Sequence, residues 1–196
     1  MSSKAILDVV ASEVVVCFKC PLSKNRKIAV PGEGNSDAQV MFIGEAPGSQ
    51  EDLQGRPFVG AAGKFLDVLL SQIGLPRKDA FIGNIVKCRP PRNRAPLPLE
   101  IQTCTPYLDR QILAVKPKFI VTLGSHSTAY IFSKAALPFS TITQIHGKLY
   151  LTSILGLKIN LFPTFHPAAA LYSAKYKQQI TEDFKQLKKE LEREKL

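Results

Sequence analysis

Residues 39–60 read QVMFIGEAPGSQEDLQGRPFVG and show the order of structural elements that recurs along this chain. The first six, 39–44, are almost all apolar, which predicts a strand buried on both faces. A loop rich in glycine and proline follows, and the Gly60-x-x-Gly63 step then opens an amphipathic helical stretch over 64–73. A buried strand, a loop and a helix in this order are typical of a parallel sheet covered by helices.

The same alternation continues along the chain. Short apolar runs predict further strands at 80–86, 118–124, 149–154 and 158–165, with 149–154 in an edge hairpin. Apolar residues at helical spacing predict helices at 99–115, at 125–133 with Ser125 as the N-cap, and from 174 onward. We expect a three-layer α/β/α fold with a central, mainly parallel, four-stranded sheet, in a single domain over residues 1–196.

The composition favours a folded protein that can bind a polyanion. Of its 196 residues 45% are hydrophobic and 21% charged, so the chain can bury a sizeable core without disulfides. No apolar run reaches the ~18–20 residues that a membrane-spanning helix needs, and the first residues lack the pattern of a cleaved signal. The formal net charge of +10 raises affinity for nucleic acid first, although many basic proteins bind no particular partner.

The cysteines are Cys17, Cys20, Cys88 and Cys104. The C-x2-C spacing of the first pair lets two thiolates hold one metal centre, and four thiolates favour a shared metal or iron–sulfur cluster because a cation must offset their repulsion. The spacing does not choose between zinc and iron–sulfur. The alternatives are buried thiols with a redox pair, or two disulfides, which an intracellular chain disfavours. A shared centre would clamp the N-terminal segment to the middle of the chain.

Open α/β sheets bind their ligands in loops at the carboxyl ends of the strands. The loop after the first strand contains Glu45, Glu51 and Phe58. Its glycines and proline make a tight backbone with exposed amides, which suits a planar amide or an anion. Phe58 either packs in the core or stacks on a flat ligand. The loop after the last strand begins with His166, which is either a structural hydrogen-bond donor or part of the same site.

The second loop combines an amide with a basic strip. Asn84 presents a hydrogen-bond acceptor and a donor side by side, which can match the edge of a base. The proline-stiffened segment that follows has four cations and no acid, which favours contacts with phosphates over a merely solvated loop. These cations are Lys87, Arg89, Arg92 and Arg94.

Together these segments resemble the family 4 uracil-DNA glycosylases. The matching stretches are 44–66, 83–97 and 165–171, with the cysteine pair at 17–20, so the similarity covers most of the chain. The resemblance implies a parallel sheet flanked by helices and a structural [4Fe-4S] cluster held by all four cysteines. It also implies an enzyme of base excision repair that flips uracil out of DNA, hydrolyses its N-glycosidic bond and leaves an abasic site.

The resemblance assigns a role to each loop. Phe58 would stack on the flipped uracil, and Asn84 would bind its O4/N3 edge and reject cytosine, whose amine and unprotonated N3 present the opposite pattern. His166 would donate to O2 and stabilise the anion that forms there. Leu171 would fill the space that the base leaves, unless 168–171 is simply a turn packed on the core.

The other side of the uracil ring would meet the backbone of Glu45, Ala46 and Pro47. Family 1 enzymes carry an aspartate where this chain has Ala46, so the acid that positions the attacking water is either Glu45, slightly favoured, or Glu51. Glu51 could instead shape the pocket against the methyl group of thymine. No lysine is identifiable as a Schiff-base nucleophile, so we expect a monofunctional glycosylase.

Two other functions stay open: a glycosylase for a wider range of deaminated bases, and a non-catalytic iron–sulfur module that binds DNA. The expected partner is uracil-containing DNA, double- or single-stranded, with a sliding clamp as a further candidate. We expect a monomer that does not bind membranes and works in a cytoplasm of the prokaryotic type, associated with the nucleoid.

Overall fold

The computed structural model describes residues 1–196 and has one sheet of six strands in the order β1-β3-β2-β4-β6-β5. The central strands β3, β2, β4 and β6 are parallel, while β1 and β5 pair antiparallel at the two edges. The strands are β1 (Glu33–Gly34), β2 (Val40–Gly44), β3 (Phe81–Asn84), β4 (Phe119–Leu123), β5 (Tyr150–Ile154) and β6 (Leu157–Thr164).

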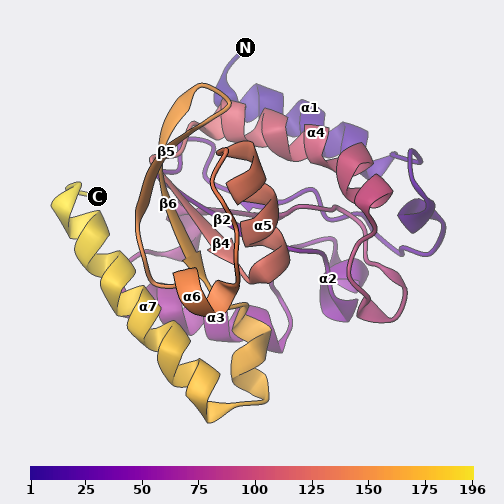
Figure 1. The fold of residues 1–196 in the computed structure, drawn as a ribbon. Helices are drawn as coiled ribbons and strands as arrows, with labels where there is room; N and C mark the ends of the chain where they lie inside the picture. The colour runs from indigo at the N-terminus through magenta and orange to yellow at the C-terminus, as the bar shows by residue number, and fades with distance from the viewer.

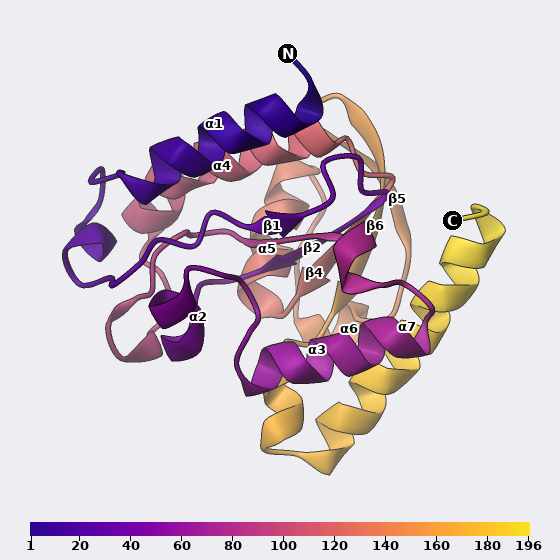
Figure 2. The same cartoon turned by 180° about the vertical axis from the view of Figure 1, so that it is seen from behind.

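Helices cover both faces of this sheet (Figures 1 and 2). They are α1 (Ser3–Val15), α2 (Ser49–Gln54), α3 (Ala61–Gln72), α4 (Pro98–Val115), α5 (Ser125–Lys134), α6 (Ile142–Ile145) and α7 (Ala174–Arg193), with short 3-10 turns that include η3 (Pro91–Asn93) and η4 (Pro167–Leu171). Helices α1, α4 and α5 lie on one side of the sheet, and α3 and α7 lie on the other. None of these helices has the length and apolar character needed to cross a bilayer.

The core is divided by the sheet into two clusters. Along β2 the side chains alternate, so that Met41 and Ile43 pack toward α1 and α4, while Val40 and Phe42 pack toward α3 and α7. Every residue of β2 and β4 is buried, as a parallel strand between two helical layers requires. The predicted three-layer α/β/α class is therefore confirmed.

Several details differ from the sequence expectations. The sheet has six strands rather than four, because two antiparallel edge strands extend the parallel core: β5 is the edge strand predicted at 149–154, and β1 was not predicted. The helices α1, α2 and α6 were not predicted; in α1, Leu7, Val10 and Val14 do have helical spacing and pack against α4. Ser125 is not a capping residue: it is the first residue of α5, and Gly124, with φ 97°, is the N-cap.

The parallel register brings distant residues to one edge of the sheet. Gly44 at the end of β2 stands beside Asn84 at the end of β3. The pairing continues past both strands, since the N–H groups of Ile85 and Val86 donate to the carbonyl oxygens of Gly44 and Glu45 at 3.0 and 3.1 Å. The loops that follow β2, β3 and β6 therefore leave the sheet at the same edge.

Candidate active site

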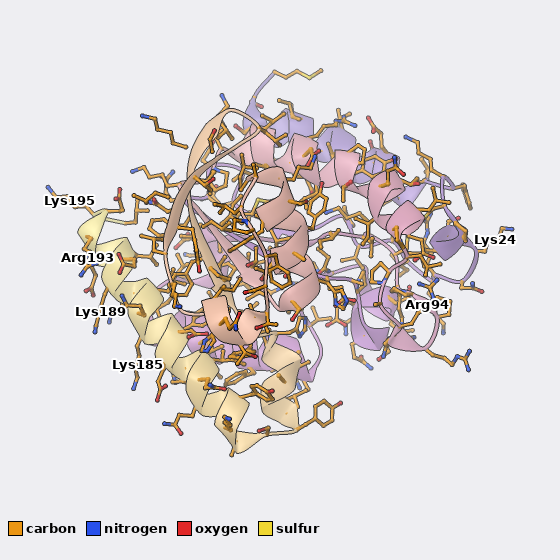
Figure 3. All side chains as sticks on the ribbon, in the orientation of Figure 1. Lys24, Arg94, Lys185, Lys189, Arg193 and Lys195 are labelled. Carbon is orange, nitrogen blue, oxygen red and sulfur yellow. The ribbon has the colours of Figure 1, made fainter.

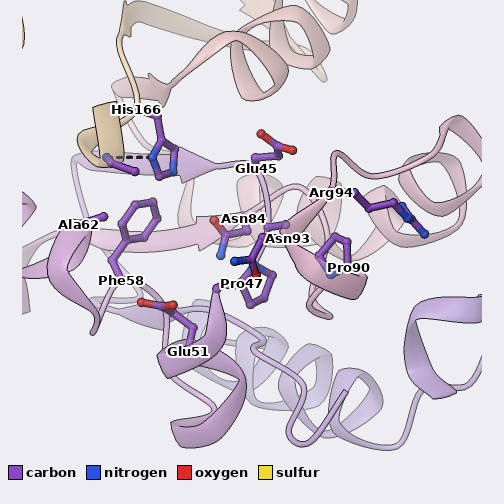
Figure 4. A pocket seen from close by; sticks show the side chains of 13 residues that line it. Glu45, Pro47, Glu51, Phe58, Ala62, Asn84, Pro90, Asn93, Arg94 and His166 are labelled. Atoms are coloured by element: carbon purple, nitrogen blue, oxygen red, sulfur yellow. Dashed lines mark hydrogen bonds between the residues drawn. The ribbon is translucent and has the colours of Figure 1, made fainter. Parts of the chain in front are cut away.

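A hollow of about 300 Å³ lies at this edge (Figure 4). It is formed by the three loops predicted to meet, together with the start of α3. Its lining residues are Glu45, Ala46, Pro47, Gly48, Glu51, Phe58, Ala62, Asn84, Pro90, Asn93, Arg94, His166 and Ala168. An aromatic ring, an amide and an imidazole from separate parts of the chain thus share one cavity.

Asn84 lies in the wall of this hollow with its side chain unpaired. The residue is 1% exposed, and neither its Nδ2 nor its Oδ1 has a hydrogen-bond partner. Leaving a buried polar group without a partner costs about 1–3 kcal/mol, and native proteins satisfy most such groups. An amide that faces a cavity with both atoms free is suited to a ligand that presents a donor and an acceptor on one edge.

Two glycines allow the site residues to approach the backbone. A Cβ on Gly44 would lie within 2.6 Å of the Phe58 ring and closer still to Oδ1 of Asn84. A Cβ on Gly124 would lie 2.9 Å from that of His166, and the φ of Gly124 is unfavourable for other residues. The two strand ends therefore require glycine so that the amide and the imidazole can be placed where they are.

Phe58 satisfies both alternatives raised by the sequence. It is 6% exposed and belongs to the core cluster below α3, yet its ring also lines the hollow. Its centroid lies 5.6 Å from that of the His166 ring, with 28° between the planes. Its φ of 49° is unusual for a bulky residue, so the surrounding contacts must hold the loop in this conformation.

Glu51 supplies such contacts. Its Oε1 accepts hydrogen bonds from the N–H groups of Val59 and Gly60, at 2.9 and 2.8 Å, directly after Phe58 and at the N-terminus of α3. A carboxylate at a helix N-terminus is favourable because it meets unpaired N–H groups and the positive end of the helix dipole. Glu51 therefore has a structural task on one oxygen, while its side chain still lines the hollow.

Glu45 is held differently. Its Oε2 lies 2.8 Å from Nδ1 of His126, the second residue of α5. This contact joins the loop after β2 to the loop after β4, and sequence analysis did not anticipate it. The signal that the sequence offered for this contact was the position of His126, two residues beyond the end of the predicted strand at 118–124.

The ring of His166 has a defined tautomer. Its Nδ1 accepts the N–H of Ala168 at 3.1 Å, so in the neutral ring the proton is on Nε2 (Figure 4). Burial lowers the pKa of His166 to about 4, although the charge of Glu51 acts in the opposite direction. The imidazole is therefore neutral at pH 7 and can donate one hydrogen bond from Nε2 into the hollow.

All four cysteines line a second, smaller cavity behind the first. None is in a disulfide, and Cys88 and Cys104 are buried. Arg26 donates to Sγ of Cys88 at 3.1 Å, and the Lys87 N–H donates to Sγ of Cys104 at 3.2 Å. Without a metal, burial raises the pKa of Cys104 to about 11.

The lining of this cavity suits an anionic group with several centres. Arg26 and Lys87 contribute two cations and no acid lines it. The described side chains contain no group of three or more histidine, cysteine or acidic residues placed to hold a single metal ion. The four thiols and the two cations are the donors and charges that this cavity offers.

One of the four predicted phosphate contacts is wrong. Lys87 is 1% exposed, and its Nζ donates to the carbonyl oxygen of Asn84 and to Oε1 of Gln111. Burial lowers its pKa to about 8. A side chain enclosed in this way cannot reach a DNA backbone.

The other three predicted phosphate contacts, Arg89, Arg92 and Arg94, differ in whether their side chains are already hydrogen-bonded within the protein. Nε of Arg89 donates to Oδ1 of Asn93 at 2.8 Å. Arg94 forms two hydrogen bonds with the buried carboxylate of Glu100, at 2.8 and 2.6 Å. Arg92 is exposed and has no such partner. Arg94 projects on the side of the molecule opposite the cations of α7, such as Lys185 and Lys189 (Figure 3).

The remaining surface candidate is Leu171, at the end of η4. It is 47% exposed and precedes Tyr172, which is 89% exposed. Leu171 is therefore not part of a packed core turn. The sequence analysis did not select Tyr172, nor Ala62, Pro90 and Asn93, which line the hollow. Of these, only Asn93 offered a signal: asparagine is enriched at positive φ, and Asn93 has a φ of 56°.

Comparisons with known proteins agree with this geometry. The model of the uracil DNA glycosylase superfamily matches residues 31–188. The chain is 54% identical to the type-4 uracil-DNA glycosylase of Saccharolobus solfataricus, over 94% of this chain and 86% of that protein. It is 45% identical to that of Archaeoglobus fulgidus, over 92% and 91%, and 39% identical to that of Thermotoga maritima, over 96% of each.

The tautomer and low pKa of His166 can be tested by NMR on protein labelled with 15N at histidine. We expect a protonated Nε2 and an unprotonated Nδ1 at pH 7. On acidification the ring should stay neutral through pH 6 and take up its second proton only as the pH falls toward about 4, because burial disfavours the cation. A His166 midpoint near 6.5 would contradict the buried environment.

Proposed function

Because this chain belongs to the type-4 uracil-DNA glycosylases of the uracil DNA glycosylase superfamily, we propose that it removes uracil from DNA by hydrolysing the N-glycosidic bond. The product is an abasic site for base excision repair. The observation that carries this proposal is the buried, unpaired amide of Asn84 in a hollow shared with Phe58 and His166. A DNA-binding module without a base pocket would have no use for that amide.

Recognition rests on complementary edges. Uracil presents an acceptor at O4 beside a donor at N3, and the Asn84 amide supplies Nδ2 and Oδ1 to match them. Cytosine presents the reverse pattern and would leave both amide atoms opposed to like groups. The Phe58 ring provides an apolar face for the base, and Ala46 and Pro47 also line the hollow.

Catalysis rests on the neutral imidazole of His166. Cleavage of the bond between C1′ and N1 leaves negative charge on the base, part of it on O2. An Nε2–H fixed by the Ala168 hydrogen bond can stabilise that charge without reorganising. The low pKa keeps the ring in this form at physiological pH.

Glu45 is the acid that we assign to the attacking water. Both acids line the hollow, but Glu51 accepts two backbone N–H groups after Phe58, whereas the recorded partner of Glu45 is the side chain of His126, so Glu45 is less committed to holding the backbone. A carboxylate so placed can orient water and face the positive charge that develops on the sugar.

Cys17, Cys20, Cys88 and Cys104 would hold a [4Fe-4S] cluster in the second cavity. The cluster would be structural and would supply no step of the hydrolysis. It would tie the turn after α1 to α4 and to the segment between β3 and α4, from which Pro90, Asn93 and Arg94 reach the hollow.

Uracil-containing DNA would lie over the hollow. Arg92 is an exposed, unpaired cation of the loop after β3, which lines the hollow through Asn93. Leu171 and Tyr172 are exposed at the end of the loop after β6, which lines the hollow through Ala168. These positions support phosphate contacts on one side and filling of the base stack on the other.

The activity is tested with oligonucleotides that carry one uracil, in single strands and opposite G or A. After incubation, alkali should cleave the uracil strand and leave matched strands with cytosine or thymine intact. His166→Leu should lower the single-turnover rate by ~10²-fold or more, because an O2 donor is lost. Absence of an abasic product from the wild-type protein would reject the enzyme. Release of hypoxanthine or xanthine at a similar rate would instead show a wider specificity.

The cluster is tested by composition. Anaerobically purified protein should be brown, with broad visible absorption and about four iron and four sulfide per chain. Cys104→Ala should remove the colour, because one ligand of the cluster is lost. It should also lower the melting temperature, because the buried Lys87 would then line an empty cavity. A colourless protein with one bound zinc would contradict the assignment.

The basic loop is tested by salt dependence of DNA binding. Arg92→Ala should weaken binding to all sequences alike and reduce the slope of log K against log salt by about one. Arg94→Ala should change the slope less, because Glu100 already neutralises that charge. Equal slopes for the wild-type protein and Arg92→Ala would show that the loop makes no phosphate contact at this residue.

A further inference from the structure

Lys87 is buried directly behind Asn84 without a counter-charge. Its Nζ donates to the Asn84 carbonyl oxygen at 2.9 Å and to Oε1 of Gln111 at 2.7 Å. Both acceptors are neutral, and no carboxylate forms an ion pair with this ammonium. Burying a charge is unfavourable unless hydrogen bonds and an opposite charge compensate it, so the position of Lys87 calls for an explanation.

The side chain of Lys87 fixes the backbone that carries the pocket amide. Lys87 Nζ donates a hydrogen bond to the backbone carbonyl oxygen of Asn84, while the side-chain amide of Asn84 has no hydrogen-bond partner. Gln111, on α4, continues the network, because its Nε2 donates to the carbonyl oxygen of Pro31 at 2.7 Å. The end of β3 is thereby tied to α4 and to the segment that precedes β1.

The main chain of Lys87 extends the same network to the cysteine cavity. Its N–H donates to Sγ of Cys104 at 3.2 Å, and its carbonyl oxygen accepts the N–H of Val30 at 2.7 Å. Lys87 also lines that cavity together with Arg26. One residue therefore contacts both the thiols and the backbone of the uracil-binding amide.

The missing counter-charge is on the cysteine side. Four thiolates around a [4Fe-4S] cluster carry a net negative charge, and the cavity offers Arg26 and Lys87 as its cations. A filled cavity would thus stabilise the ammonium that holds Asn84. This step rests on the proposed function and cluster, whereas the hydrogen bonds to Asn84 and Gln111 do not.

We propose that Lys87 is a positioning residue for uracil recognition: it holds the Asn84 amide in its binding pose and couples that pose to the occupied cysteine cavity. Lys87 touches neither base nor DNA. Its loss should therefore weaken binding of the base while contacts to the DNA backbone persist.

The experiment compares purified, cluster-containing wild-type protein with Lys87→Met. Two affinities are measured: inhibition by free uracil, and binding of a duplex with a stable abasic-site analogue. Lys87→Met should weaken uracil inhibition on the order of tenfold, as expected for a loosened hydrogen-bonding group, with a similar fall in the single-turnover rate and little change in abasic-site binding. Its visible absorption should also fade faster under an iron chelator.

Controls separate positioning from general destabilisation. Ile159→Ala opens a cavity in the core at the opposite end of β6 and should lower the melting temperature without changing uracil inhibition. If Lys87→Met does not fold, Gln111→Leu decides, because it removes one partner of Nζ and leaves the cysteine loop intact. It should weaken uracil inhibition in the same direction.

The proposal is overturned if uracil inhibition stays at the wild-type value in the folded variant, or if uracil and abasic-site binding weaken equally. Either result would leave the proposed function standing, because that function is decided by the wild-type protein on uracil-containing DNA. Conversely, an inactive wild-type protein would reject the glycosylase whatever the variants do.

Discussion

The side-chain amide of Asn84 is buried, and neither of its polar atoms has a hydrogen-bond partner. Such an arrangement persists only where the surrounding structure fixes the position of the residue. For Asn84 that constraint comes from three directions. The parallel ladder continues past β3 and fixes the residues after it, Gly44 leaves the space that the side chain occupies, and Lys87 grips the carbonyl oxygen. Each unpaired group costs about 1–3 kcal/mol, and in the proposed function a matching base edge would supply the missing partners.

Four acidic side chains of this basic protein anchor its backbone. Glu51 caps α3 behind Phe58, and Glu100 binds both Arg94 and the N–H of Leu97 at the start of α4. Asp52, 2% exposed, accepts the N–H of Lys27. Asp183 joins α7 to the end of β6 through Thr164, two residues before His166. These four acids are thus committed to contacts within the chain.

Sequence reasoning predicted the parallel core, because buried parallel strands appear as continuous apolar runs whatever their partners. It also predicted that Phe58, Asn84 and His166 would lie at one edge, since they follow strands of that core. It wrongly predicted a phosphate contact for Lys87, because the residue type indicates the charge of a side chain but not whether an irregular segment turns that side chain toward solvent or toward the core. It could not foresee that Glu100 would neutralise Arg94, or that His126 would reach Glu45, since neither contact follows from sequence spacing.

The four cysteines that line one cavity come from positions 17, 20, 88 and 104. During synthesis the first pair must therefore wait, as free thiols, until more than half of the chain has left the ribosome. Once α4 has emerged, the pairs can meet before β4, β5 and β6 have left the ribosome. The N-terminal half can close around its cavity first, and the later strands are then added to an edge that is already in place.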